Sequence, residues 1–280
     1  MRLNGASDGA VAVLGCRLSP VTMDEAVLRC EEAIAAGGYY QHMSVNAAKL
    51  VAMQDDPTLE GMVTSCDLVT ADGQSVVWAS RLLGTPVPER VTGIDLMERL
   101  LQAADNNGYR VFILGAKPDV LAAALANLHE RYPNLTIAGS RDGYFAESEM
   151  LDVCDEIRQA HADMLFVAMS SPRKEYFLGE QGASLRVPFA MGVGGSVDVI
   201  AGVAKRAPRL LQRLGLEWAY RLAQEPRRLG NRYLSTNLRF AAMLLRAMRP
   251  SSRRESAVGA AAASSQLGAP ERKEQTDRVA

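Results

Sequence analysis

Short apolar runs alternate with longer helix-like segments along the chain, and this alternation constrains the fold more than any other sequence feature. Runs of this length that are apolar on both faces are typical of strands inside a parallel sheet. Strands are predicted at residues 11–14, 39–45, 68–69, 110–114, 136–138, 164–169 and 189–193, and helices at 22–36, 47–54, 75–83, 95–106, 119–132 and 147–160. The alternation predicts an α/β fold: a Rossmann-like parallel sheet with right-handed connections, flanked by helices.

The amount of apolar sequence is sufficient for a large folded core. The 280 residues are 48% hydrophobic, enough for one large core or two small ones. No run of 18 apolar residues is present, and the N-terminal stretch, which carries Asp8, lacks the basic-then-apolar layout of a signal peptide. The four cysteines, Cys16, Cys30, Cys66 and Cys154, have no CxxC spacing. We therefore expect a cytosolic protein with reduced thiols.

The net charge of −1 conceals a strong asymmetry along the chain. Residues 205–254 hold 13 Lys and Arg against two acidic residues, whereas residues 1–204 carry a net charge of −11. A basic segment on an acidic body indicates an anionic partner, either membrane phospholipid or nucleic acid. Nucleic acid is disfavoured because aromatic residues are few and the body is acidic. We expect a Rossmann-like core at 1–204, a basic helical appendage at 205–250 and a disordered tail at 251–280.

Two helices are predicted in the appendage, at 208–224 and 232–248, with a break at 225–230. In the second helix the apolar residues share one face and the arginines another. The apolar face holds Leu234, Leu238, Ala241, Leu245 and Met248, and the basic face holds Arg232, Arg239 and Arg246. Such a helix can lie in a membrane interface with its arginines on anionic headgroups. Packing against the protein's own core or against a second subunit is the alternative.

Polar side chains follow two of the predicted strands at the point where each strand ends. Asp72 comes just after the strand at 68–69, and Ser44 and Asn46 close the strand at 39–45. Ligands of open α/β sheets bind just beyond the carboxyl ends of the strands, so these side chains are candidate site residues. Purely structural interpretations stay open, because Asp72 can form a turn and Ser44 or Asn46 can cap a helix.

Glycine-rich and charged loops follow the later strands. The candidates in these loops are Gly115, Lys174, Glu175, Gly192, Gly194, Gly195 and Asp198. Backbone amides of such glycine loops can approach phosphate groups closely, although plain strand-to-helix turns explain the glycines equally well. The first strand is not followed by GxGxxG or by an acidic residue spaced for a ribose, which argues against a nucleotide-cofactor oxidoreductase.

Nine stretches of the sequence, by their order and spacing, resemble the WecG/TagA/CpsF glycosyltransferases (glycosyltransferase family 26) from about residue 11 to residue 245. They are LGCRLSPVTMDEAV, SVNAAKL, TADGQSVV, ERVTGIDLMERL, VFILGAKPDV, YPNLTIAGSRDGYF, SSPRKE, GVGGSVDVIAG and RAPRLLQRLGLEWAYRLAQEPRRLGNRYL. The resemblance implies inverting transfer from a UDP-sugar to a sugar on a polyprenyl-diphosphate lipid, in the synthesis of teichoic acid, enterobacterial common antigen or exopolysaccharide. It also implies that the appendage docks at the cytoplasmic face of the plasma membrane and completes the active site.

The resemblance also implies roles for single residues. Asp72 matches the catalytic base that takes the acceptor proton, Ser44 and Asn46 match a Thr-x-Asn pair near the substrates, and Arg90 lies on the acceptor side. No cofactor is implied, and the sequence has no DxD motif for a metal clamp. The negative charge of the leaving diphosphate would then be stabilised by backbone amides at residues 192–195 and by appendage arginines. The arginine candidates are Arg206, Arg213, Arg221, Arg228 and Arg232, with Arg221 and Arg228 favoured.

The chain departs from the family pattern in one loop. The family usually has Pro-Lys-Gln-Glu where this chain has Pro172-Arg173-Lys174-Glu175, and the glycine-rich segment before it is changed to Ala168-Met169-Ser170-Ser171. Lys174 replaces a glutamine expected near the substrates, and a cation there can pair with phosphate or with a sugar carboxylate. The donor sugar therefore stays open among N-acetylmannosamine, its uronate and a hexose. Alternatives from other classes are the oxidoreductase and a non-enzymatic membrane-binding scaffold.

Overall fold

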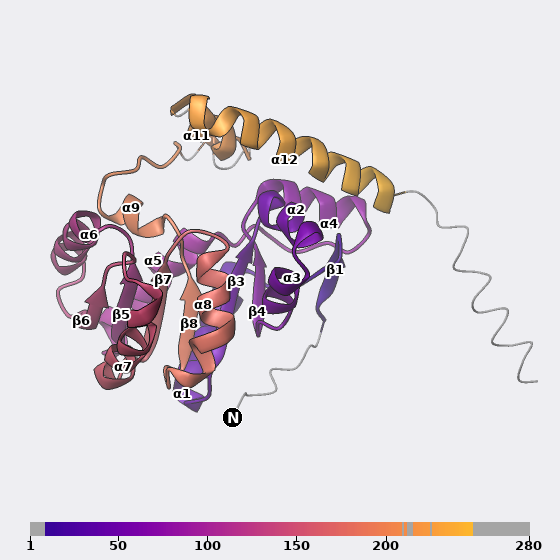
Figure 1. Cartoon of the computed structure of the whole chain (residues 1–280). Helices are drawn as coiled ribbons and strands as arrows, with labels where there is room; N and C mark the ends of the chain where they lie inside the picture. Colours follow the sequence, from indigo (N-terminus) through magenta and orange to yellow (C-terminus); the bar gives the residue numbers. More distant parts are fainter. Residues whose placement is uncertain (1–8, 209, 212–214, 225, 249–280) are drawn as a thin grey trace, which may run out of the picture.

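The computed structural model describes residues 9–208, 210–211, 215–224 and 226–248; the tail predicted at 251–280 lies outside them. Its centre is a six-stranded parallel sheet in the order β4-β3-β8-β7-β5-β6 (Figure 1). The strands are β3 (Tyr40–Val45), β4 (Leu68–Ala71), β5 (Arg110–Gly115), β6 (Thr136–Arg141), β7 (Met164–Ala168) and β8 (Phe189–Gly192). The predicted parallel α/β sheet is confirmed.

The core consists of two apolar clusters, one on each face of the sheet. Successive residues of a strand point to opposite faces, so Phe112 and Leu114 of β5 join one cluster while Val111 and Ile113 join the other. The first cluster packs against α2 (Ala47–Asp55), α3 (Pro57–Thr64), α4 (Gln74–Leu82), α7 (Met150–Ala160) and α8 (Arg173–Gln181). The second packs against α1 (Met23–Ala36), α5 (Gly93–Asn107), α6 (Pro118–Arg131) and α9 (Ser196–Ile200).

The strand predicted at 11–14 lies outside the main sheet. β1 (Val11–Val13) pairs antiparallel with β2 (Cys16–Leu18) to form a separate hairpin. Its tight turn places Leu14 at φ 51° and Gly15 at φ 87°. Tight hairpin turns with positive φ usually have Asn, Asp or Gly at both central positions. Here only Gly15 fits that pattern, because leucine rarely adopts a positive φ, so the turn was not predicted from the sequence.

Three of the described helices were absent from the sequence-based prediction: α3, α8 and the short α9. α3 follows α2 after a single residue, Asp56, whose side chain caps the new helix by accepting a hydrogen bond from the Leu59 N–H at 3.0 Å. α8 begins at Arg173, so Lys174 and Glu175, which were expected in a loop, lie in its first turn. Pro172 precedes α8 and supplies no side-chain cap, which left its start without a sequence signal.

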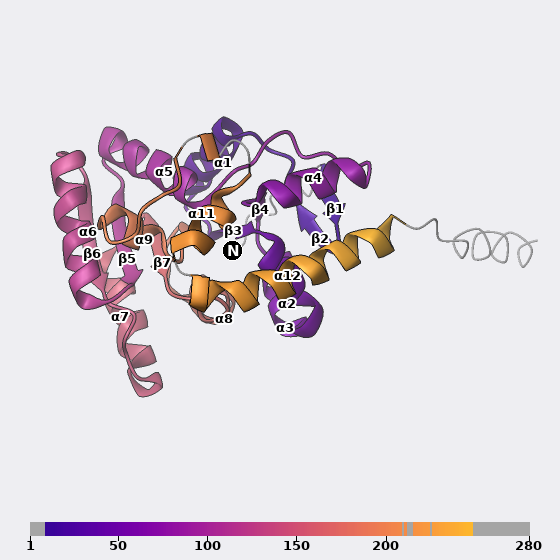
Figure 2. The ribbon, with the colours of Figure 1, turned by 90° about the horizontal axis from the view of Figure 1, so that it is seen from above.

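The predicted break at 225–230 is wrong for residues 226–230, because α12 (Pro226–Ala247) already begins at Pro226, and residue 225 lies outside the described residues. Proline is well tolerated in the first turn of a helix, where its missing N–H would have no partner. α11 (Glu217–Gln224) precedes it, and together they lie over the end of the sheet that carries α2 and α4 (Figures 1 and 2). None of the described helices is long and apolar enough to cross a lipid bilayer.

The inner face of α12 packs along α2. Phe240 is buried, and Met243 and Leu244 pack against the first core cluster. Beside them, Arg239 contacts both carboxylate oxygens of Asp55 at 2.7 Å. The apolar face predicted from the residue spacing is a different one and points outward, with Leu234, Leu238 and Leu245 each about 64% exposed. The division into a core at 1–204 and an appendage at 205–250 stays a prediction.

Candidate active site

Ser44, Asn46 and Asp72 meet at the carboxyl end of β3 and β4. The two strands are in register, with Ser44 opposite Thr70, and the Asp72 N–H donates to the Val45 carbonyl at 2.9 Å. Asp72 and Ser44 are partly exposed, and Asn46 is exposed. The parallel register therefore brings together three side chains that the sequence separates by up to 28 positions.

Two glycines lie beside these side chains, and Gly93 makes the closer approach. A methyl group on Gly93, the first residue of α5, would lie 3.2 Å from the Ser44 Oγ. A methyl group on Gly73 would lie 3.5 Å from the Asn46 Cβ. Asn46 also caps α2, because its Oδ1 accepts a hydrogen bond from the Lys49 N–H at 3.0 Å. The capping interpretation of Asn46 is thus confirmed, and its place beside Asp72 leaves the substrate role open.

Asp72 lies in an environment that raises its pKa above the ordinary value for an aspartate. Burial is the main cause, because it disfavours the charged form, and the nearby Glu217 carboxylate raises the pKa further. Arg90, Lys49 and a hydrogen bond from the Gly93 N–H oppose this rise without cancelling it. A carboxylate with raised proton affinity beside a partly open edge is suited to act as a general base.

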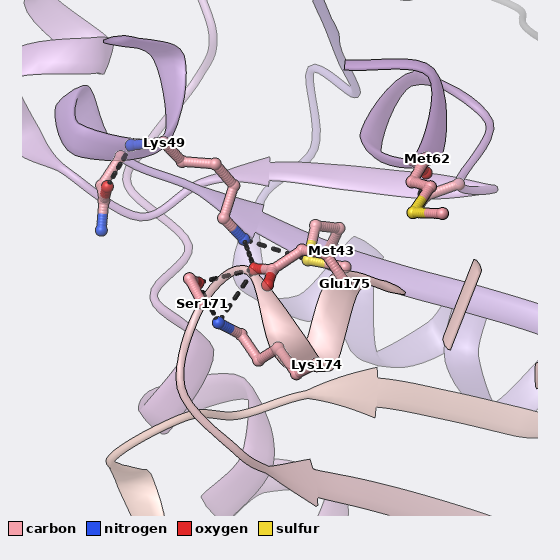
Figure 3. A network of polar contacts seen from close by, with 8 residues as sticks. Met43, Lys49, Met62, Ser171, Lys174 and Glu175 are labelled. Atoms are coloured by element: carbon pink, nitrogen blue, oxygen red, sulfur yellow. Dashed lines mark hydrogen bonds and ion pairs between the residues drawn. The ribbon is translucent and has the colours of Figure 1, made fainter. Parts of the chain in front are cut away.

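A cluster of two lysines around one carboxylate lies next to this edge (Figure 3). Glu175 Oε1 is 2.8 Å from the Lys49 Nζ and 2.9 Å from the Lys174 Nζ, and it also accepts a hydrogen bond from the Ser171 hydroxyl at 2.8 Å. Lys174 donates a further short hydrogen bond to the Ser171 Oγ, and Lys49 lies 3.0 Å from the Met43 Sδ. The three charged side chains are at most 9% exposed.

The charges of this cluster do not balance, because two ammonium groups share a single carboxylate. Burial would raise the pKa of Glu175, but Lys49 and Lys174 together hold it at about 2, so the carboxylate stays ionised. Burial and repulsion from Lys49 lower the pKa of Lys174, while Glu175 and Asp72 partly oppose that fall. Glu175 Oε2 is buried and has no hydrogen-bond partner among the described residues. The cluster thus presents a net positive charge near Asp72.

Lys49 is a candidate that the sequence interpretation missed. It lies within α2, three residues after Asn46, so it faces the same end of the sheet as the strand exit before it. A lysine inside a predicted helix is most often solvent-exposed, whereas this one is buried. The sequence clue to Lys49 was its position three residues after Asn46, which places Lys49 in the first turn of the helix that Asn46 caps.

The glycine loop after β8 lies against Lys174. A methyl group on Gly192 would lie 3.1 Å from the Lys174 Cδ, and one on Gly194 would lie 3.9 Å from its Nζ. The Gly194 N–H already donates to the Val167 carbonyl at 3.3 Å, so this amide is engaged within the fold. A methyl group on Gly195 would lie 3.5 Å from the Asp198 carboxylate. Phosphate binding by this loop stays a prediction.

Gly115 has a structural reason to be glycine. Its φ is +123°, and a methyl group there would lie 2.5 Å from the backbone carbonyl of Ala168. The next residue, Ala116, donates its N–H to that same carbonyl at 2.9 Å. Glycine is therefore required by the close approach of the ends of β5 and β7. A role of Gly115 in substrate binding stays a prediction.

Ion pairs connect the chain beyond residue 204 to this end of the molecule. Arg90 contacts Glu217 of α11 at 3.3 Å, and Arg206 contacts Asp95 of α5 at 2.6 Å. The Nε and Nη2 groups of Arg206 are buried without a hydrogen-bond partner in the described part of the chain. Arg213 lies outside the described residues, as do the side chains of Arg221, Arg228 and Arg232. The predicted arginine contacts to a diphosphate therefore stay predictions.

An open hollow of about 500 Å³ lies beside Arg90 and Asp95. It is also lined by Met23, Glu89, Glu98, Arg99, Gln102 and Tyr132. A second hollow, of about 510 Å³, lies at the far edge of the sheet between α6, β6 and α7. Within the described ranges, no three His, Cys, Asp or Glu side chains gather as metal ligands.

Comparison with known proteins gives a consistent family match. The family model described as "Glycosyl transferase WecG/TagA/CpsF family" matches residues 11–254. A Bacillus spizizenii protein named N-acetylglucosaminyldiphosphoundecaprenol N-acetyl-beta-D-mannosaminyltransferase is 39% identical over 177 residues, which cover 63% of this chain and 68% of that protein. Both matches are to glycosyltransferases, as the nine sequence stretches predict.

Proposed function

Because the chain belongs to the WecG/TagA/CpsF family of glycosyltransferases, we propose that it transfers a hexose-type sugar from a UDP-sugar to a sugar on a polyprenyl-diphosphate lipid, in cell-surface polymer synthesis. The name of the Bacillus relative describes a lipid-diphosphate-linked N-acetylglucosamine acceptor and N-acetylmannosamine transfer. We extend this acceptor class to the present chain. The family match favours this function over an oxidoreductase or a non-enzymatic scaffold.

Asp72 carries the proposed chemistry, because it combines partial exposure at the sheet edge with a raised pKa. Its carboxylate takes the proton of the acceptor hydroxyl, whose oxygen then forms a bond to the anomeric carbon of the donor. The bond from that carbon to the diphosphate oxygen breaks, and the nucleoside diphosphate leaves with the electron pair. One displacement of this kind inverts the anomeric configuration.

The leaving diphosphate is stabilised by cations rather than by a resident metal in this proposal. Lys49 and Lys174 supply a fixed positive charge under the glycine loop, next to Asp72. Charges that are already in place cost no reorganisation when the leaving group develops its charge. Arginines of the appendage, Arg221 and Arg228 above all, add further neutralisation.

The exposed face of α12 supports attachment to a membrane surface. Leu234, Leu238 and Leu245 are exposed along one side of α12, whose other side packs on the core, and the exposed Met248 directly follows the helix. Such a helix can enter the headgroup region while the sheet end below it faces the lipid-linked acceptor. We therefore propose peripheral association with the cytoplasmic face of the plasma membrane.

The test is an Asp72→Asn variant assayed for transfer to a short-chain lipid-diphosphate acceptor. We expect the turnover rate to fall by about a factor of 100 or more, because the amide cannot accept the proton. Binding of UDP, measured by calorimetry, should change little. A variant that keeps near wild-type turnover would remove Asp72 from the role of base. An Asp163→Asn variant is the matched control, since the Asp163 carboxylate accepts a hydrogen bond from the Arg110 N–H at the other end of the sheet.

A further inference from the structure

Arg90 lies between two carboxylates that belong to different parts of the chain. Asp72 directly follows β4, and Arg90 acts on it as a neighbouring positive charge. Glu217 is the first residue of α11, and its Oε2 is 3.3 Å from the Arg90 Nη1. The paired side chains are only 16% and 19% exposed. The appendage therefore brings an acidic group, shielded from solvent, to the candidate active site.

This acidic group is unexpected in its setting. Residues 205–250 contain only two acidic residues, and Glu217 is one of them. If the appendage served only to neutralise a diphosphate, a carboxylate beside Asp72 would be unfavourable. The Glu217 carboxylate would repel both the Asp72 carboxylate and the anionic ligand. The position of Glu217 therefore calls for a task other than anion binding.

We propose that Glu217 is a positioning residue of the transfer reaction, which holds the Arg90 guanidinium beside Asp72 and offsets its charge so that the Asp72 carboxylate remains a proton acceptor. This inference rests on the proposed function. Glu217 touches no reacting atom. It acts through Arg90, whose planar guanidinium would otherwise be able to form two hydrogen bonds with Asp72 and occupy the oxygens that must receive the proton.

The charges around Asp72 make such an offset necessary. Lys49 from α2, Lys174 from α8 and Arg90 from the loop before α5 are positive, and the Gly93 N–H donates a hydrogen bond. Each of these favours the ionised form and would leave Asp72 a weak base. Opposing them, the Glu217 carboxylate raises the pKa of Asp72. Its contribution adds to that of burial, the larger cause, and opposes the three cations and the Gly93 hydrogen bond.

A direct test is to titrate the Asp72 side chain in the full-length protein by carbon NMR of isotope-labelled aspartate, with Asp72→Asn to assign the signal. We expect Glu217→Gln to lower the Asp72 pKa by about half a unit or more, and Arg90→Gln to raise it by a similar amount. The double variant should titrate near the wild-type value. Opposite shifts of this kind do not arise from a general loosening of the fold.

Asp55→Asn is the matched control, because it breaks another ion pair between the appendage and the body, the one to Arg239 on α12. Its Asp72 titration should equal that of the wild type. The inference is overturned if Glu217→Gln leaves the Asp72 titration unchanged, or if Asp55→Asn moves it equally. Hydrogen exchange of α11 and α12 shows whether each variant remains folded.

The rate measurement then separates this inference from the proposed function. In the wild type, the acidic limb of the transfer rate should follow Asp72, and in Glu217→Gln it should move to lower pH together with a reduced maximal rate. A wild-type protein without transfer activity refutes the proposed function, while the NMR shifts still decide the role of Glu217. If the wild type is active and the acidic limb of its rate profile is unchanged in Glu217→Gln, the inference about Glu217 is refuted while the proposed function stands.

Discussion

Glu175 accepts three hydrogen bonds or ion pairs on one carboxylate oxygen while fully buried between Lys49 and Lys174. Removing one partner of a buried ionic cluster leaves uncompensated charge, which typically costs about 3–5 kcal/mol. We expect Glu175→Gln to lower the free energy of unfolding by about that amount, measured by urea denaturation. Lys174→Gln is the control, and its loss should be smaller because the Lys49 contact remains. Equal stability of Glu175→Gln and wild type would contradict the prediction.

The same carboxylate should make stability depend on acid pH. The pKa of Glu175 is lowered from 4.5 to about 2, so the folded state binds its proton less readily than the unfolded chain. Its contribution is fully present above pH 4.5 and is lost as the pH falls from 4.5 through 2. The difference in unfolding free energy between wild type and Glu175→Gln should therefore shrink over that window. A constant difference would show that the effect of Glu175 is packing alone.

At the residue scale, the sequence correctly predicted which polar side chains follow the ends of β3 and β4, while their role in a site stays a prediction. Ser44, Asn46 and Asp72 follow strands, and parallel pairing had to bring them to one edge. Lys49 was missed because nothing in a helix sequence marks which lysine will be buried. Glu217 was missed because its contact with Arg90 joins positions 127 residues apart, and only the docking of α11 creates it.

At the scale of elements, α12 shows what periodicity can and cannot decide. The steps of four and three from Leu234 to Met248 correctly predicted an amphipathic helix. They did not predict that its neighbouring face, with Phe240, Met243 and Leu244, packs on α2. Both faces are apolar, and the choice between them depends on the surface of α2, which local sequence does not contain. By contrast, the helix predicted at 22–36 matches α1 to within one residue, and its start is fixed by a local interaction, the capping box of Thr22 and Glu25.

Phe240 should therefore fix α12 to the body, whereas Leu238 should not. We expect Phe240→Ala to destabilise the docked helix by about 3 kcal/mol, the usual cost of truncating a buried phenylalanine. Hydrogen exchange of the α12 amides measures this as faster exchange relative to the sheet. Leu238→Ala, at a site 63% exposed on the same helix, should change exchange by less than about 0.5 kcal/mol. Equal effects of the two substitutions would contradict the docking of α12 through Phe240.

At the scale of the whole molecule, charge and apolar exposure coincide at one end. The basic appendage lies over the carboxyl end of β3 and β4, and its outer face exposes Leu234, Leu238 and Leu245. α1 packs on the second core cluster, on the opposite face of the sheet from α2 and α4. Apolar side chains exposed on a segment that is rich in arginine suit an anionic bilayer, and in the proposed function this face would bring the Asp72 edge toward the headgroups. Because the acceptor sugar is attached to a membrane lipid in the proposed function, this orientation places the base on the side from which the acceptor arrives.

Membrane binding should then depend on that outer face and not on exposed leucines in general. We expect the double variant Leu238→Ser, Leu245→Ser to lose about tenfold or more in partitioning onto vesicles that contain anionic lipid, since each buried leucine contributes about 1.5 kcal/mol or more. Leu28→Ser is the control, because Leu28 is 55% exposed on α1. Transfer to a vesicle-embedded acceptor should fall with the partitioning, while transfer to a short-chain acceptor in solution should persist, because the Asp72 edge is unaltered. Unchanged co-sedimentation together with a smaller oligomer in the double variant would instead assign the face to a second copy of the chain.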